Sequence, residues 1–299
     1  MFTPTSMIAL AKTCNKRVRH GGSREKISYV GLQNHTYANN LGFSEALQLV
    51  DNPYPQGAYG GQNYLPIYKI LRADLEKKIS VGENIGDALD EECAEMARIV
   101  SQEKSDELLR ALRISFREIL RNVFEHSGAP AAGLCAQYWP TRDVVEICIS
   151  DRGMGVSKSL SEDRLHSGLS DRDAVQIALM PGVSSKARAQ KKRPVAQRSE
   201  WDNSGYGLFF AHRLFGQFGW FGIASGSAAA LIKNGKPAQI GKADIEGTIV
   251  SMRLNLGRIE DIEEEITRIR DLAHRVKTRL GVRGLKISSV EAFLSGETF

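Results

Sequence analysis

The chain has 299 residues, 42% of them hydrophobic and 25% charged, and these ordinary globular values predict one or two domains with a sizeable core. No segment approaches the run of about 18 apolar residues that a membrane helix requires, and the opening residues are too weakly apolar for a signal peptide. Four scattered cysteines without a CxxC pair argue against a zinc site or a disulfide framework and favour a reducing cytoplasm.

The first hundred residues carry weak patterns. Residues 1–14 suit a helix or a strand, 20–32 include a short strand-like run, and 39–50 suit a short amphipathic helix. Turn-forming residues dominate 51–64, and the segment 63–79 is typical of a strand that enters a helix. We therefore predict a small α/β module over residues 1–95, with no role assigned to it.

The patterns sharpen from residue 106 onward. A helical stripe of apolar residues runs through 106–127, strands are predicted at 133–140 and 144–150, and a short helix ends at Pro181. A polar, basic loop over 182–204 leads to a helix over 207–218. Three strand-like runs then follow, at 220–225, 228–233 and 247–256, with residues 234–237 as a hairpin turn. These elements predict one domain over 96–257, followed by a charged helical tail over 258–299.

Three short segments carry the candidate chemistry, and the first lies on the helix predicted over 106–127. Glu118, Asn122 and His126 are spaced four apart and share one face of that helix. The amide oxygen of Asn122 suits a hydrated magnesium ion, and Glu118 suits the orientation or deprotonation of an attacking group. An ordinary solvent-facing stripe has the same spacing.

The second segment is a DxGxG pattern, in which Asp151, Gly153 and Gly155 follow a buried strand. A carboxylate at a strand end accepts a hydrogen bond from the exocyclic amine of adenine, and glycines let the backbone approach the base. Structural strand-to-turn junctions use the same residues. The third segment places Gly205 and Gly207 before a helix, whose N-terminal N–H groups attract phosphate, although an ordinary loop-to-helix turn looks the same.

With Gly247 and Thr248 opening a final strand, the order of these segments resembles the GHKL superfamily of ATPases, which includes gyrase, heat-shock chaperone, histidine-kinase and mismatch-repair members. The resemblance covers about half of the chain, from about residue 105 to 255. It implies a Bergerat fold, which is a two-layer α/β sandwich with a mixed sheet, one face of which is covered by helices that include 105–127 and 207–218. ATP would lie between these helices and a mobile lid.

The resemblance implies a role for each matched residue. Glu118 matches the general base, Asn122 the magnesium ligand, and Asp151 the residue that reads adenine, with Thr248 supporting it. Further nucleotide contacts are implied for Gly153, Gly155, Gly205, Tyr206, Gly207 and Leu208. The loop 182–204 matches the lid, in which Lys186 or Arg188 would reach the γ-phosphate.

The sequence differs from the family pattern at several points, and these differences reduce the number of functions that the resemblance implies. Asn203 and Tyr206 stand where histidine kinases have small residues, and no histidine lies in a phosphoacceptor context. The run Asn122–His126 is closest to the soluble anti-sigma-factor-type serine kinases, which implies a protein partner. We therefore expect a cytoplasmic regulatory protein that binds ATP with magnesium, and two classes remain open. One is an ATPase or protein serine kinase, and the other is a non-catalytic, nucleotide-gated binding switch.

Two basic clusters support a third, weaker reading, a nucleic-acid-binding ATPase. The clusters are Lys16, Arg17, Arg19, Arg24 and Lys26, and then Lys186, Arg188, Lys191, Lys192, Arg193 and Arg198. Solvated or phosphate-facing loops carry the same charges, and the sequence does not settle the oligomeric state.

Overall fold

The computed structural model describes residues 2–21, 35–47, 61–80, 85–162, 166–183, 206–280 and 286–296. Within these ranges the chain is a mixed α/β structure built on one five-stranded sheet, with the strand order β1-β2-β3-β5-β4. The strands are β1 (Tyr64–Leu71), β2 (Ala131–Trp139), β3 (Val144–Asp151), β4 (Gly219–Lys233) and β5 (Gln239–Asn255).

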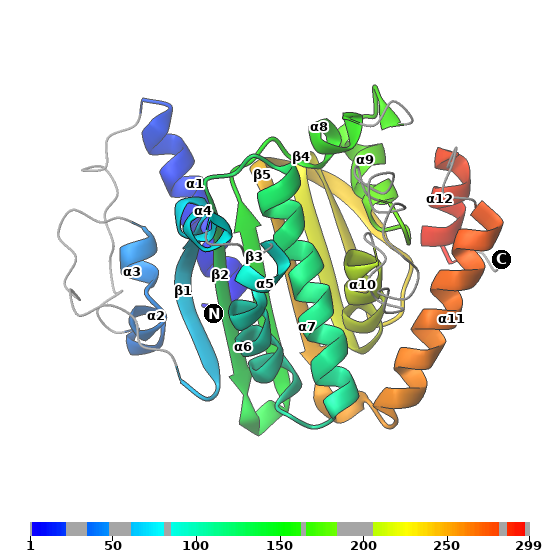
Figure 1. Ribbon diagram of the computed structural model, residues 1–299, viewed down its shortest axis with the longest axis horizontal. Helices are drawn as coiled ribbons and strands as arrows, with labels where there is room; N and C mark the ends of the chain where they lie inside the picture. The colour runs from blue at the N-terminus through cyan, green and yellow to red at the C-terminus, as the bar shows by residue number, and fades with distance from the viewer. Residues whose placement is uncertain are drawn as a thin grey trace.

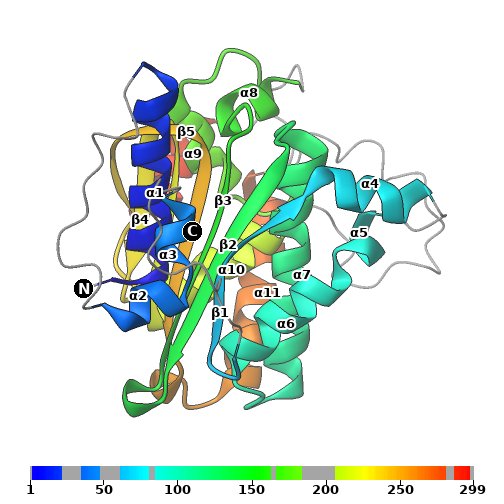
Figure 2. The ribbon, with the colours of Figure 1, turned by 90° about the vertical axis from the view of Figure 1, so that its left-hand side faces the viewer.

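Helices lie on both faces of the sheet (Figures 1 and 2). The longer ones are α1 (Pro4–Arg19), α4 (Arg72–Ser80), α6 (Asp90–Ser101), α7 (Asp106–Arg121), α9 (Asp171–Ala178), α10 (Gly207–Phe218), α11 (Ile262–Leu280) and α12 (Ile287–Leu294). The shorter ones are α2 (Thr36–Asn40), α3 (Phe43–Ala46), α5 (Ile85–Ala88) and α8 (Val156–Ser161). No helix in these ranges combines the length and apolar character that a bilayer crossing requires.

The prediction of a mixed sheet was wrong for the described strands, because every pairing among them is antiparallel. The mixed sheet was part of the Bergerat fold that the resemblance to the GHKL superfamily implied. Here the helical segment after β3 leads to β4, but β5 lies between these two strands and pairs with both. The helical crossover therefore joins strands that are not neighbours, and no parallel pair forms.

The sheet separates two apolar cores. On one face α6, α7 and α10 cover the sheet, as Figure 2 shows for α6 and α7, and the sequence predicted α7 and α10 there. On the other face α1, with α2 and α3, packs over Cys135, Cys148 and Ile249 in a smaller core. The α/β sandwich was thus predicted correctly, but the helical cover on the second face was not.

Strand β3 is buried along its whole length because both of its faces are covered. Val145, Ile147 and Ile149 belong to the larger core, whereas Cys148 belongs to the smaller one, as alternating side chains require. The strand ends at Asp151, so its last side chain emerges where the sheet meets the loops. This placement is what the sequence pattern of an apolar run ending in Asp predicted.

Two of the three strand-like runs after residue 219 form one long strand, β4. The runs predicted at 220–225 and 228–233 are continuous, and the register shifts between Ser225 and Ala228 are accommodated within the β4–β5 pairing. Gly226 has φ of +58°, and the Asp171 carboxylate accepts hydrogen bonds from the Ser227 N–H and hydroxyl groups. The register shifts and the positive φ of Gly226 therefore mark a bulge within β4. Correspondingly, Gly247 and Thr248 lie inside β5 and do not open it.

The described part of residues 1–95 shares its cores with the rest of the chain. Strand β1 is an edge strand of the sheet, pairs with β2 and is followed by α4, so the strand entering a helix predicted over 63–79 is confirmed. Leu65, Ile70 and Leu75 pack in the same core as α7 and α10. The predicted boundary at residue 95 therefore coincides with no break in that core. The lid expected over 182–204 lies largely outside the described residues.

A buried histidine on α10 makes the stability of the fold depend on pH in the acidic range. His212 lies edge-on to Phe209 and Phe221, with ring centroids 5.1 and 6.1 Å away. Burial, followed by the charge of Arg213, lowers the pKa of His212 to about 3. An unfolded histidine titrates near pH 6.5. The neutral ring therefore contributes stability that is fully present above about pH 6.5 and is lost as the pH falls toward 3.

We expect the free energy of unfolding to fall between pH 6.5 and 4.5, with a limiting slope from this group of about 1.4 kcal/mol per pH unit. His212→Leu should remove that part of the slope in urea unfolding measured across this range. His274→Gln is the matched control, because His274 is exposed on α11. An identical slope in wild type and His212→Leu would contradict the assignment.

Candidate functional site

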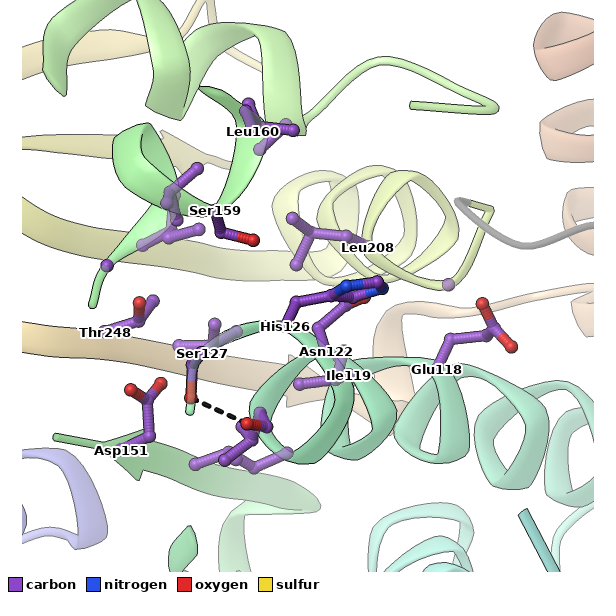
Figure 3. Close-up of a pocket in the computed structure, with 18 of the residues that line it drawn as sticks. Glu118, Ile119, Asn122, His126, Ser127, Asp151, Ser159, Leu160, Leu208 and Thr248 are labelled. Carbon is purple, nitrogen blue, oxygen red and sulfur yellow. Dashed lines mark hydrogen bonds between the residues drawn. The ribbon is translucent and has the colours of Figure 1, made fainter. Parts of the chain in front are cut away.

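One pocket lies between α7, α8, α10, the end of β3 and the middle of β5, and the sequence motifs meet there (Figure 3). Its cavity measures about 100 Å³, several times the space that one water molecule needs, so it has room for part of a small organic molecule. Among its lining residues, those predicted from the sequence are Glu118, Asn122, Asp151, Gly155, Gly207, Leu208 and Thr248.

Asp151 and Thr248 lie together at one end of the pocket (Figure 3). The Asp151 carboxylate is almost fully buried, and its Oδ1 accepts a hydrogen bond from the Gly153 N–H at 2.6 Å. Burial raises the pKa of Asp151, while hydrogen bonds from the Gly153 and Thr248 backbones, the charge of Lys12 and the neighbouring Ser127 hydroxyl act against that rise. A buried acceptor held by several donors is suited to one specific polar contact with a ligand.

Glycines are required around Asp151 by close packing. A Cβ on Gly153 would lie 2.3 Å from the Cβ, Oγ and carbonyl O of Ser127. A Cβ on Gly247 would lie 2.3 Å from the Asp151 carbonyl O, and Gly247 has φ of +76°. Gly155 has φ of +81° and stands at the start of α8. The DxGxG pattern therefore has a steric reason in this fold, independent of any ligand.

Gly153→Ala is expected to destabilise the protein by about 1–3 kcal/mol, the usual cost of forcing atoms into a packed site. The measurement is urea unfolding at neutral pH. Gly241→Ala is the control, because a Cβ there would meet nothing within 4 Å. Equal midpoints for the two variants would show that the turn after Asp151 adjusts freely.

Two serines that no sequence motif included, Ser127 and Ser225, hold this end of the pocket together, and Ser127 also lines it. The Ser127 hydroxyl donates to the Val123 carbonyl O at 2.6 Å, the dashed line in Figure 3, and the Ser127 carbonyl accepts from the Met154 N–H at 2.8 Å. The Ser225 hydroxyl donates to the Gly247 carbonyl O and accepts from the Val156 N–H, each at 2.9 Å. Ser127 thus joins the end of α7 to the Asp151 turn, and Ser225 joins β4 to β5 and α8. Apart from the Ser127–Val123 bond, these contacts join residues remote in sequence, so no local pattern predicts them.

The middle of the pocket is apolar. Its walls come from α7 and the turn after it, from α8 and α10, and from the sheet, through Ile119, Val123, Ile149, Leu160, Leu208, Ile223 and Val250. Ile149 and Val250 face each other on the paired strands β3 and β5. Such walls accept a flat apolar ring, while Asp151 provides a hydrogen-bond acceptor at one end.

Glu118 and Asn122 lie toward the opposite end of the pocket (Figure 3). Helix α7 changes at Arg121 into a π-helical turn, Asn122–His126, in which the Ser127 N–H donates to the Asn122 carbonyl O at 3.2 Å. π-helical turns occur frequently at functional sites. Asn122 is exposed and lines the pocket, whereas Glu118 and His126 are nearly buried.

Arg121 is a charged neighbour that the sequence analysis did not single out. Its guanidinium donates to Glu118 Oε1 at 3.0 Å and contacts both carboxylate oxygens of Glu125. All three side chains are at most 19% exposed, so water screens these ion pairs less than it screens surface pairs. The three side chains are three and four residues apart, the spacing at which side chains meet on one helical face.

The third motif is described only in part. Gly207 opens α10 against α7, and a Cβ there would lie 2.6 Å from the Glu118 Cβ, so this glycine permits close helix packing. Tyr206 does not line the pocket, and its ring contacts the Lys277 ammonium of α11, which lies 5.3 Å from the ring centroid. Gly205 and Lys186 lie outside the described residues, so their predicted phosphate contacts stay predictions.

Part of the N-terminal basic cluster is paired within the protein. Lys16 contacts Asp244 at 2.6 Å, and Arg19 contacts Glu246. Both acidic partners belong to β5, so these contacts fasten α1 to the sheet. The pairing reduces the positive charge that α1 offers to a nucleic acid.

Comparisons of this chain with protein-family models, with curated proteins and with solved structures found no match.

Proposed function

We propose that the pocket binds ATP with magnesium in the manner of the GHKL ATPases. The observation that carries this proposal is the convergence of separate sequence motifs on one cavity. Residues from α7, from the end of β3, from the start of α10 and from β5 line it together, although they are far apart in the sequence. An ordinary solvent-facing stripe on α7 would not have brought Glu118 and Asn122 to the same cavity as Asp151.

The adenine base would occupy the Asp151 end. The apolar walls at Ile149 and Val250 would enclose its ring, and the Asp151 carboxylate would accept a hydrogen bond from the exocyclic amine. Thr248 lines the cavity beside Asp151 and its backbone N–H already supports that carboxylate. An acceptor at this position favours adenine over guanine, whose keto oxygen would face it without a shared proton.

The phosphates would lie toward Asn122 and the start of α10, where backbone N–H groups and the helix dipole favour negative charge. No cluster of three or more metal-binding His, Cys, Asp or Glu side chains occurs among the described residues. This fits a magnesium ion held by one Asn122 amide oxygen together with phosphates and waters, a coordination that magnesium commonly adopts. When bound, the ion would neutralise the charge of the phosphates.

Glu118 would act as the general base that orients or deprotonates the attacking water or hydroxyl group. Under this proposal the protein is an ATPase or a protein serine kinase that works on a protein partner in the cytoplasm. The Glu118–Arg121 ion pair favours the alternative, a nucleotide-gated binding switch with slow or absent turnover, because a carboxylate held by a guanidinium is a weaker base.

Incubation of the purified protein with γ-labelled ATP and magnesium separates these functions, when done alone and with proteins encoded beside it. Release of labelled phosphate indicates an ATPase, and label on the partner indicates a kinase. Binding measured by calorimetry without either product supports the switch. No ATP binding at millimolar concentration would overturn the proposal.

A further inference from the structure

A lysine from the far face of the sheet reaches the adenine end of the proposed nucleotide pocket. Lys12 lies on α1, and its Nζ donates a hydrogen bond to the carbonyl O of Asp151. The two residues are 139 positions apart in sequence. Lys12 does not line the pocket, so it acts on Asp151 from behind the strand that carries it. The function proposed above gives this contact no role.

Helix α1 is fastened along the two strands that form the adenine end. Near its start, the Thr5 N–H donates to Glu146 Oε1 at 3.1 Å, where the helix dipole also favours the buried carboxylate. Near its end, Lys16 and Arg19 pair with acidic residues of β5. The helix therefore follows β3 from Glu146 to Asp151 and also holds β5, which contributes Thr248. Figure 2 shows α1 on the side of the sheet opposite α6 and α7.

We propose that Lys12 is a positioning residue of the nucleotide site, which keeps the Asp151 carboxylate ionised and couples helix α1 to the adenine end of the pocket. The role of Lys12 in nucleotide binding rests on the proposed ATP function. The effect of Lys12 on the ionisation of Asp151 does not depend on that function. The inference assigns a role to the N-terminal segment: displacement of α1 by a partner would weaken nucleotide binding from the other side of the sheet.

The charges around the pair agree with this role. Burial lowers the pKa of Lys12 to about 8, against the opposing attraction of Asp151. Arg152 lowers the same pKa further, whereas Cys148 and Glu246 raise it. For Asp151, Lys12 is the charged side chain that favours the ionised form. A buried ammonium is costly, so its placement beside Asp151 is compensated by that carboxylate.

The direct test is a carbon-13 titration of aspartate carboxyl signals without nucleotide, with the Asp151 signal assigned by its loss in Asp151→Asn. Lys12→Met should raise the midpoint of Asp151 by about one pH unit, the scale of removing a nearby opposite charge. Lys12→Arg should restore the wild-type midpoint. Lys16→Met is the matched control, one helical turn further along α1, and should leave the midpoint unchanged while removing a docking contact.

A measurement on the wild type tests the same inference without depending on whether the variants fold. The Asp151 carboxyl signal should show a second inflection near pH 8, where Lys12 loses its proton. An unchanged Asp151 midpoint in Lys12→Met, an equal shift in Lys16→Met, or no inflection near pH 8 would each overturn the inference. Calorimetry with ATP below pH 6 then tests the coupling, and weaker binding by Lys12→Met than by Lys16→Met is expected.

The two proposals fail in different ways. If the wild type does not bind ATP, the nucleotide function fails, while the titration still decides whether Lys12 controls the ionisation of Asp151. If ATP binds equally to wild type and Lys12→Met below pH 6, the coupling fails and the nucleotide function stands.

Discussion

Glu118→Gln is expected to bind ATP within a few-fold of wild type and to lose turnover by about 10²–10⁴-fold, the usual contribution of a general base. The carboxylate would contact the attacking group rather than the bound nucleotide, so its removal affects the transition state more than the ground state. Calorimetry measures the binding, and phosphate release or transfer of label measures the turnover. Because Glu118 packs against Gly207, the near-isosteric glutamine is the appropriate replacement.

Asn122→Ala is the companion variant and should behave in the opposite way. Asn122 is exposed at the pocket, so its loss should leave the fold intact but remove the amide oxygen proposed for magnesium. ATP binding in the presence of magnesium should then fail. Normal turnover by Glu118→Gln would contradict a catalytic role for Glu118. Wild-type ATP binding by Asn122→Ala would contradict the role of Asn122 as a magnesium ligand.

Asp151→Asn is expected to weaken ATP binding by about 1–3 kcal/mol, the cost of leaving a buried polar group without a suitable partner. The amide retains the volume of the carboxylate, but it changes the charge and the hydrogen-bonding pattern beside the adenine amine. For the same reason GTP should bind the wild type far less tightly than ATP. Calorimetry with both nucleotides measures these differences.

Two controls separate recognition of the base from damage to the pocket. The unfolding midpoint of Asp151→Asn reports whether the turn held by Gly153 survives. A ribose triphosphate without a base should bind wild type and variant equally. Equal affinity of the wild type for ATP and GTP would contradict the role assigned to Asp151.

The elements around the pocket could be predicted from the sequence where one pattern extended over a whole element. The apolar stripe of residues 106–127 predicted α7, and the apolar run before Asp151 predicted β3. Buried faces require apolar residues at regular positions along a helix, and a strand buried on both faces requires them along its whole length. The spacing of Glu118 and Asn122 then placed both side chains on one side of α7. The cavity brings them together with Asp151, as the motif order suggested.

The contacts that cross the sheet could not be predicted. Lys12 reaches Asp151 only because α1 packs on the second face, and the pattern of residues 1–14 left helix and strand open. Ser225 joins β4, β5 and α8 through single hydrogen bonds, which leave no periodic signal in the sequence. The bulge at Gly226 was not predicted either, because its register shifts depend on the pairing of β4 with β5.

The π-helical turn that follows α7 determines how Ser127, at one end of the pocket, is oriented relative to Glu118, at the other end. Each residue advances an α-helix by about 100°, so the extra residue in the turn changes the direction in which Ser127 leaves the helix relative to Glu118. Deleting one residue from Asn122–His126 would restore regular winding and improve local helix geometry. It would also rotate Ser127 away from the loop after Asp151. The helix would become more regular, but the pocket would no longer form.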